Sequence, residues 1–310
     1  MAVLNLPRLR ALAVDLVVSD VITACGGMAA ELLAIPWIEL SPHPLYLPSK
    51  GLPPVGSGLA AGTGIRGRLR DAVLRSLTAR SLRAGTRQRA AAGSALACRP
   101  ATGPSRRLIA TLPALEVPRP DWPAEAVVVG PLHFEPTNHV LAIPPGSGPV
   151  VVVAPSTALT GARGMAQVAL DCLVPGRGLP AGARVVVSRL NGPDLTVPPW
   201  AVVGLGRQDE LLAQADVVVC GGGHGMVAKA LLAGVPLVVV PGGGDQWEMA
   251  NRVVRQGSGL LVRPLSADGL VAAVGEVLSS PRYREAARQA AASVAEVADP
   301  VEVCHRALAG

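Results

Sequence analysis

Aromatic side chains are scarce in this sequence. Phe, Tyr and Trp make up 2% of its 310 residues, whereas hydrophobic residues as a whole make up 50%. The core must therefore be built from Val, Leu and Ala. Only 16% of the residues are charged, which excludes an extended or disordered chain. Because the Val/Leu runs are short and end at Gly or Pro, we expect a buried parallel sheet flanked by helices.

Lysine is nearly absent, and so are paired cysteines. Lys50 and Lys229 are the two lysines, so the net charge of +6 comes almost entirely from arginine. Genomic base composition accounts for part of such usage, and we expect no nucleic-acid partner. The five cysteines form no CxxC pair, which argues against a zinc or redox site. Apolar stretches are broken early, as by Asp15, so we expect neither a transmembrane helix nor a signal peptide, and a cytoplasmic location.

The length predicts two domains, because single cores stop growing near about 250 to 300 residues. We expect a first domain over 1–135, a Pro/Gly-marked linker over 136–149 and a second domain over 150–310. In the first, the Pro-rich stretch 41–64 predicts a long irregular lip over a cleft. Residues 66–89 predict a basic amphipathic helix. We favour a solvated helix face there, with contact to the inner face of a membrane as the alternative. The other expected elements are strands at 13–20, 35–38, 107–112 and 126–130 and a helix at 28–33.

The second domain is predicted to be a doubly wound α/β domain, because strand and helix patterns alternate along it. The expected strands are 149–154, 183–188, 201–203, 217–219, 237–240 and 259–262. The expected helices are 165–173, 210–214, 226–233, 248–256, 266–278 and 281–296.

Two glycine clusters follow neighbouring strands of this series. Residues 220–226 read CGGGHGM, and residues 241–246 read PGGGDQ. Ligands of open α/β sheets bind beyond the carboxyl ends of the strands. Glycines that lead into a helix let backbone N–H groups approach an oxyanion, and the helix N-terminus adds positive potential. The first cluster is therefore a candidate diphosphate cradle, and the carboxylate and carboxamide of Asp245 and Gln246 suit the hydroxyls of a sugar.

A dinucleotide site is the alternative interpretation of the same loop. Residues 223–228 fit a GxGxxA fingerprint, and Asp245 stands where a ribose-binding acid would be. That fingerprint opens a Rossmann domain, whereas here three strands precede it. We therefore keep an NAD(P)-binding oxidoreductase as the weaker alternative.

The stretch 215–246, ADVVVCGGGHGMVAKALLAGVPLVVVPGGGDQ, and its continuation to Asn251 resemble the donor-site signature of the UDP-glycosyltransferase superfamily. The resemblance is strongest to its actinobacterial macrolide and glycolipid branch. Further similar segments are 15–36, LEVPRP at 115–120, VGPL at 129–132 and QDELL at 208–212. The resemblance implies a GT-B fold, in which two Rossmann-like domains face a cleft with the donor on the second domain and the acceptor on the first. It also implies inverting sugar transfer without metal or cofactor, from a UDP- or dTDP-sugar.

The resemblance also implies roles for particular residues. Gly222, Gly223, His224, Gly225 and Met226 would hold the phosphates, and Ser156 and Thr157 would reach them from the other side. Asp245 and Gln246 would bind the sugar, and Leu205 and Gln208 the base. The acceptor would lie against Trp37, His43 and Tyr46.

Some positions depart from the family pattern. A phosphate-binding His falls on Gly221, a ribose-binding acid on Lys229 and a frequent Asn on Met249. Asp20 matches the acid that orients the catalytic base, a histidine expected in an N-terminal segment on the order of 70 residues that precedes the part matched here. We therefore expect an incomplete N-terminal domain, with Asp20 either as the catalytic orienter or as a strand-end cap. No remaining histidine is an obvious substitute base: His43 in the Pro-rich stretch is the least unsuitable, with His133 and His139 near the linker as the others.

These observations predict a glycosyltransferase that moves a hexose to a hydroxyl of a small lipophilic acceptor such as a glycolipid or polyketide. Loss of the base lowers rates by about 10² to 10⁴-fold. A catalytically silent nucleotide-sugar-binding protein or auxiliary subunit is therefore the alternative from another class.

Overall fold

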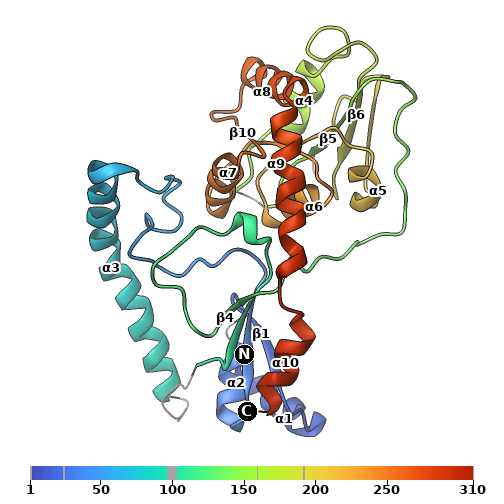
Figure 1. Cartoon of the computed structure of the whole chain (residues 1–310). Helices are drawn as coiled ribbons and strands as arrows, with labels where there is room; N and C mark the ends of the chain where they lie inside the picture. The colour runs from blue at the N-terminus through green and yellow to red at the C-terminus, as the bar shows by residue number, and fades with distance from the viewer. Residues whose placement is uncertain (1, 24, 96–102, 159, 191–192, 310) are drawn as a thin grey trace.

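The computed structural model describes residues 2–23, 25–95, 103–158, 160–190 and 193–309. Within these ranges the chain forms two parallel sheets, one in each domain (Figure 1). The first sheet has the order β1-β2-β3-β4, formed by Val17–Asp20, Trp37–Ser41, Arg106–Ile109 and Ala126–Val128. The helices around it are α1 (Ala2–Leu12), α2 (Cys25–Leu33) and α3 (Gly64–Ala95), with a 3₁₀ turn η1 (Pro113–Leu115) after β3. The helix α1 was not expected from the sequence.

The second sheet has six strands in the order β10-β9-β8-β5-β6-β7. Its strands are β5 (Val150–Ala154), β6 (Arg184–Ser188), β7 (Ala201–Gly204), β8 (Val217–Cys220), β9 (Leu237–Val239) and β10 (Gly259–Leu261). The helices are α4 (Met165–Cys172), α5 (Gln208–Leu212), α6 (His224–Leu232), α7 (Asp245–Gln256), α8 (Ala267–Ser279), α9 (Pro281–Ala292) and α10 (Pro300–Ala309), with η2 at Ser293–Glu296. The doubly wound parallel sheet predicted for this domain is confirmed.

Burial on both faces explains why these strands are continuous apolar runs. In β5, Val150 and Val152 join one buried cluster with α6 and α7, while Val151 and Val153 join another with α4 and α8. Parallel strands covered by helices on both sides need apolar residues at every position, since neither face meets water. Valine side chains fill much of this interior, and Tyr283 is the one aromatic residue among those described that is buried in it.

The first domain has a smaller core, and the end of the chain completes it. Ile38, Leu108 and Val129 pack with Val303 of α10, and Ala298 N donates to Val128 O at 3.4 Å. Figure 1 shows α10 beside the first sheet, below α9. The predicted boundary of 150–310 for the second domain is therefore wrong at its end, because the last helix belongs to the first domain's core.

The 3₁₀ turn η1 belongs to the first domain but packs in the core of the second. Leu112 and Leu115 are fully buried within the large cluster of the second domain. Arg252 Nη1 of α7 donates to Leu115 O at 2.7 Å, and Arg255 Nη2 donates to Glu116 O at 2.5 Å. Each domain thus contributes a segment to the core of the other, which holds the two sheets in one arrangement.

Candidate donor and acceptor site

Three loops meet at the carboxyl edge of the second sheet. They follow β5, β8 and β9, which are neighbours in the sheet. Gln246 Nε2 donates to Ser156 Oγ, and Gly242 N donates to Gln246 Oε1, both at 2.9 Å. Gly242 packs so closely that a Cβ there would lie 2.0 Å from Thr160 O. The predicted meeting of the two glycine clusters at one sheet edge is therefore observed.

The glycines of the first cluster have two different functions. Gly222 has φ +81°, and a Cβ on it would lie 2.9 Å from Val239 Cγ1 and 3.0 Å from Gln246 O, so this position forms the turn. A Cβ on Gly223 or Gly225 would meet no described heavy atom within 4 Å. No described side chain caps the start of α6. The first N–H groups of α6 are therefore left for a ligand.

His224 lies at the first position of α6, but its side chain reaches the first domain. Its Nε2 is 2.9 Å from Thr111 Oγ1, which follows β3. Burial, with smaller contributions from His43 and Arg252, lowers the pKa of His224 to about 4. The imidazole is therefore neutral near pH 7 and bridges the two domains. In this structure the ring is bonded to Thr111, and the phosphate-binding role expected for His224 stays a prediction.

Several other predicted donor residues are held by protein partners. Gln246 is buried and both ends of its carboxamide are bonded, so it braces the loops, and its role toward a sugar stays a prediction. Ser156 Oγ accepts from Gln246 and from Ala158 N. Met226 packs against the core. Asp245 at the start of α7 and Thr157 are exposed, and of the predicted sugar and phosphate side chains these two remain open.

The predicted base site contains a partly buried ion pair that the sequence did not reveal. Lys229 Nζ donates to Glu135 Oε1 at 2.6 Å and to Gln208 Oε1 at 3.0 Å, while Gln208 N donates to Glu135 Oε2 at 2.9 Å. The Lys229 and Glu135 side chains are 9% and 13% exposed. Glu135 immediately precedes the stretch predicted as a linker, and it places an acid beside the position where the family pattern has one. Leu205 is half-buried in the loop before α5.

Of the residues predicted on the acceptor side, His43 and Tyr46 are brought together. Their rings stack with centroids 4.4 Å apart, after the carboxyl end of β2. Trp37 lies at the opposite end of β2, where it packs against Gly27 and donates to Glu31 Oε1 at 3.3 Å. This placement corrects the prediction that Trp37 faces the acceptor. The prediction was based on the aromatic ring alone, and the sequence does not show at which end of the strand that ring lies.

Asp20 acts as a cap in this structure. Its Oδ1 accepts from Ile22 N at 2.7 Å and from Thr23 N at 3.3 Å, which closes the turn after β1. Of the two roles considered for Asp20, these contacts correspond to the strand-end cap, and its catalytic role stays a prediction.

Arg252 was missed by sequence reasoning although it organises the cleft. It is 4% exposed in α7 among Met249 and Val253, and its guanidinium lies over the Tyr46 ring at 5.6 Å and 3.7 Å from Glu116 Oε2. Burial raises the pKa of Glu116 despite this arginine. An arginine on the apolar face of a predicted helix was the available signal.

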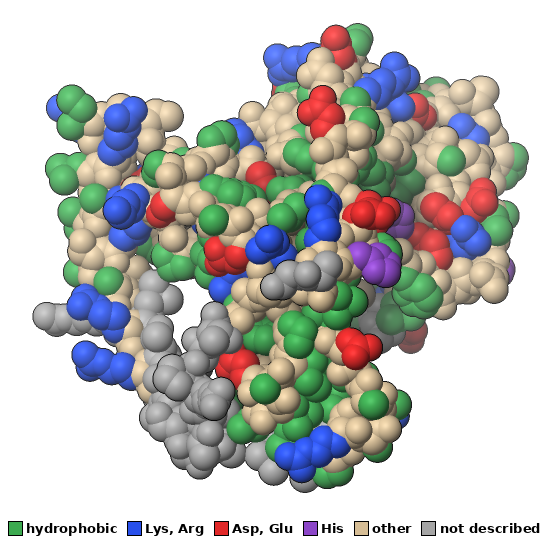
Figure 2. Space-filling model, turned by 60° about the horizontal axis from the view of Figure 1, so that its bottom comes forward, with side chains coloured by type: hydrophobic (Ala, Val, Ile, Leu, Met, Phe, Trp, Pro, Cys, Tyr) green, Lys and Arg blue, Asp and Glu red, His purple; other side chains and the backbone are tan. Residues whose placement is uncertain are grey.

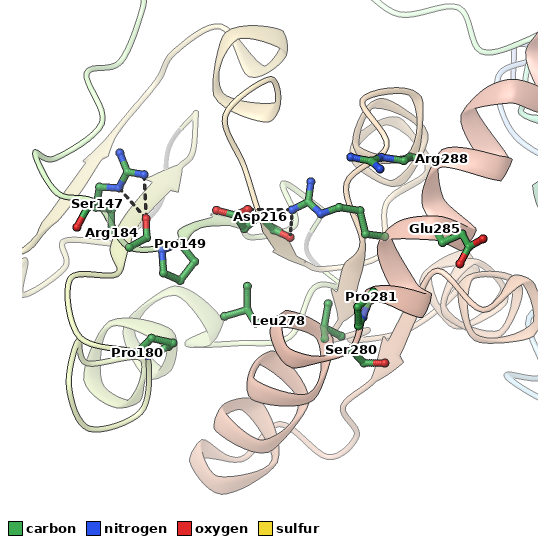
Figure 3. Close-up of a pocket in the computed structure, with 13 residues that line it drawn as sticks. Ser147, Pro149, Pro180, Arg184, Asp216, Leu278, Ser280, Pro281, Glu285 and Arg288 are labelled. Carbon is green, nitrogen blue, oxygen red and sulfur yellow. Dashed lines mark hydrogen bonds and ion pairs between the residues drawn. The ribbon is translucent and has the colours of Figure 1, made fainter.

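The Pro-rich segment closes over α7, as predicted for a lip. Gly56 N donates to Glu248 Oε1 at 3.1 Å, and Gly58 packs against Trp247. A cavity of about 400 Å³ lies between this segment and α7, lined by apolar residues such as Leu45, Leu47 and Leu52 and by Arg252. A larger hollow of about 930 Å³ lies at the other edge of the second sheet, beside Asp216 and Arg284 (Figure 3). It faces the amino ends of the strands and is remote from the glycine loops.

Comparison with known proteins identifies the class. Residues 192–309 match the family described as erythromycin biosynthesis protein CIII-like, C-terminal domain. The chain is 32% identical over 293 residues to 4'-demethylrebeccamycin synthase of Lentzea aerocolonigenes, covering 87% of this chain and 68% of that protein. It is 33% identical over 201 residues to a PGL/p-HBAD biosynthesis rhamnosyltransferase of Mycobacterium bovis (strain BCG / Pasteur 1173P2), covering 63% of this chain and 43% of that protein. The chain thus spans about two thirds of the first relative and less than half of the second.

Solved structures show the same architecture. The glycotransferase of kitacinnamycin superposes with a TM-score of 0.72 at 23% identity, over 99% of this chain and 80% of that chain. The spinosyn rhamnosyltransferase SpnG, solved with thymidine diphosphate, gives 0.65 at 18% identity over 98% and 77%. Two α/β domains, each with a parallel sheet, and a helix N-terminus left open between them are the architecture of the GT-B glycosyltransferase fold. The chain belongs to the UDP-glycosyltransferase superfamily, in a branch with macrolide-type and glycolipid enzymes.

The neutral state of His224 predicts a pH dependence of stability. The folded-state pKa of about 4 lies below the ordinary value of 6.5. The unfolded chain therefore binds a proton between these values while the folded chain does not, and stability falls as the pH is lowered from 6.5 to 4. We expect His224→Gln to flatten this part of the profile, measured as the free energy of urea unfolding against pH. Parallel profiles for the variant and the wild type would contradict the assignment.

The Lys229–Glu135 pair predicts a stability coupling. Lys229→Met leaves the Glu135 carboxylate with Gln208 N but without its cation, which lowers the free energy of unfolding by about 2 kcal/mol, below the range for a fully buried pair. Glu135→Gln in the same chain removes that charge, so the double variant should regain most of the loss. Denaturant unfolding of the single and double variants measures this coupling. Additive losses would show that the pair does not act as a unit.

Proposed function

We propose that this protein transfers a hexose from a nucleoside diphosphate sugar to a hydroxyl of a small lipophilic acceptor, with inversion and without a metal ion. The observation that carries the proposal is the open N-terminus of α6, where Gly223 and Gly225 leave the first N–H groups accessible. Backbone donors and the helix dipole together stabilise a diphosphate, both bound and as it leaves. The match to the spinosyn rhamnosyltransferase SpnG, solved with thymidine diphosphate, supports a dTDP-sugar among the candidate donors.

The donor is proposed to lie along the three converging loops. The backbone of residues 222–226 faces the diphosphate, and Thr157 faces it from the loop after β5. The Asp245 carboxylate, exposed at the start of α7, accepts hydrogen bonds from sugar hydroxyls. Gln246 keeps this geometry by tying Ser156 to Gly242. His224 contributes by holding the start of α6 against Thr111.

His43 is the proposed base on the acceptor side. Its Nδ1 is 2.8 Å from Pro44 O, an acceptor, so Nδ1 carries the proton of the neutral ring and Nε2 holds a lone pair. The His43 ring stacks on Tyr46, over which the Arg252 guanidinium of α7 lies. Nε2 would take the proton of the acceptor hydroxyl as its oxygen bonds the anomeric carbon and the diphosphate departs. The apolar cavity under the Pro-rich segment supports a lipophilic acceptor.

Gly223→Val tests the donor site. The side chain projects into open space where the diphosphate is proposed, so we expect affinity for dTDP and UDP to fall at least about tenfold while thermal stability is unchanged. Gly222→Ala is the contrasting variant in the same loop. Strain at φ +81° and contact with Val239 should lower its thermal stability, unlike that of Gly223→Val. Calorimetric titration with dTDP, UDP and dTDP-rhamnose measures the effect. Unchanged affinity in Gly223→Val would overturn the proposed site.

His43→Gln tests catalysis separately from binding. We expect turnover in hydrolysis of dTDP- and UDP-sugars to fall by about 10² to 10⁴-fold, since a general base is removed, while donor affinity stays the same. Donor binding by the wild type without any hydrolysis or transfer would favour the catalytically silent nucleotide-sugar-binding protein. A kcat that does not respond to the substitution would remove His43 from the mechanism.

A further inference from the structure

The long helix α3 has one face anchored to the protein. Asp71 is 2% exposed, and its Oδ2 accepts from Gly62 N at 2.7 Å. Arg75 Nη1 donates to Leu52 O at 2.6 Å. These contacts tie the helix to the Pro-rich segment. The same side of the helix, at Arg75, Thr78 and Ala79, borders a cavity of about 510 Å³ that Tyr46 and Pro53 also line.

The opposite face of α3 carries a strip of large apolar side chains that nothing described covers. Ile65 is 87% exposed, Leu69 63%, Val73 51% and Leu77 70%. Residues four apart follow one another along the same side of a helix, so these four form a continuous strip. A run of this kind is unusual on a protein surface and marks an interaction site.

Arginines surround this strip, and acidic groups are missing from it. Arg66, Arg68, Arg70, Arg83 and Arg87 are exposed. The sequence of α3 contains a single acid, Asp71, which points inward and pairs with Arg70. In Figure 2, basic and hydrophobic side chains alternate along the arm that α3 forms at the edge of the molecule.

We propose that the outer face of α3 docks on an anionic lipid bilayer. An apolar strip bordered by arginines is the pattern of a helix that lies in the plane of a membrane interface, where the apolar side enters the acyl boundary and the cations meet lipid phosphates. The charges argue against a second copy on this face, because pairing two α3 helices would oppose arginine to arginine. No described helix is long and apolar enough to span a bilayer.

Docking through this strip would place the apolar cavities near the membrane, where a lipophilic acceptor is found; this step rests on the proposed function. The inner face of α3 borders the 510 Å³ cavity, and Pro53 and Val55 line both this cavity and the one beside α7. Docking through the outer face would hold these apolar spaces close to the bilayer surface. A lipophilic acceptor dissolved in the membrane would thereby reach the cleft without crossing bulk water.

Vesicle sedimentation tests the proposal with the full chain. We expect co-sedimentation with vesicles of equal parts phosphatidylglycerol and phosphatidylcholine, and little with pure phosphatidylcholine. Replacing Ile65, Leu69, Val73 and Leu77 by Ser should abolish it. The matched control replaces Leu132, Val140, Val197 and Val301, which are also exposed, and should bind as the wild type does. Replacing Arg66, Arg68 and Arg87 by Gln should weaken partitioning roughly 100-fold at low salt.

The outcomes separate docking from the donor site. All variants should keep their affinity for dTDP or UDP and their melting temperature, because the altered side chains lie outside the glycine loops. Docking is overturned by equal sedimentation of the wild type and the strip variant, or by no preference for anionic vesicles. It is also overturned if the strip variant instead dissociates an oligomer in analytical ultracentrifugation, which would assign the strip to self-association.

Discussion

The structure depends on the insertion of η1 of the first domain into the core of the second. Leu112 and Leu115 lie fully buried among side chains from the second sheet and its helices, and the Arg252 guanidinium binds the Leu115 carbonyl from α7. A backbone carbonyl taken out of water needs such a donor, and a buried arginine needs acceptors in return. This exchange fixes the distance between the glycine loops and the loops after β2 and β3.

The same constraint explains why several polar residues of the cleft are committed to the protein. His224 meets Thr111 because β3 and the start of α6 are held face to face, and burial there keeps the ring neutral. Gln246 and the Lys229–Glu135 pair brace neighbouring loops. What remains for a ligand is mainly backbone N–H groups at α6. Such donors suit a diphosphate whose charge must be stabilised as it leaves.

Much of the architecture could be predicted because local signals agreed with one another. The apolar runs of β5 to β9 and the glycines after β8 and β9 indicated a parallel sheet with two loops at one edge, and the sheet order β9-β8-β5 brings them together. The predictions failed where a contact joins distant segments. Trp37 was expected in the cleft from its residue type, but packing against Gly27 holds it at the other end of β2. Glu135, Thr111 and Arg252 had no local pattern that named their partners.

The sequence by itself determined the two-domain α/β class, the family and the position of the two glycine loops, because strand periodicity, glycine placement and helix starts are properties of short segments. Only the tertiary structure decided which side chains remain available at those loops, that α10 completes the first domain and that no described residue covers one face of α3. These features depend on hydrogen bonds and apolar contacts between residues up to hundreds of positions apart, such as Gly56 with Glu248. These contacts stabilise the protein only once the fold has brought both partners together and removed them from water.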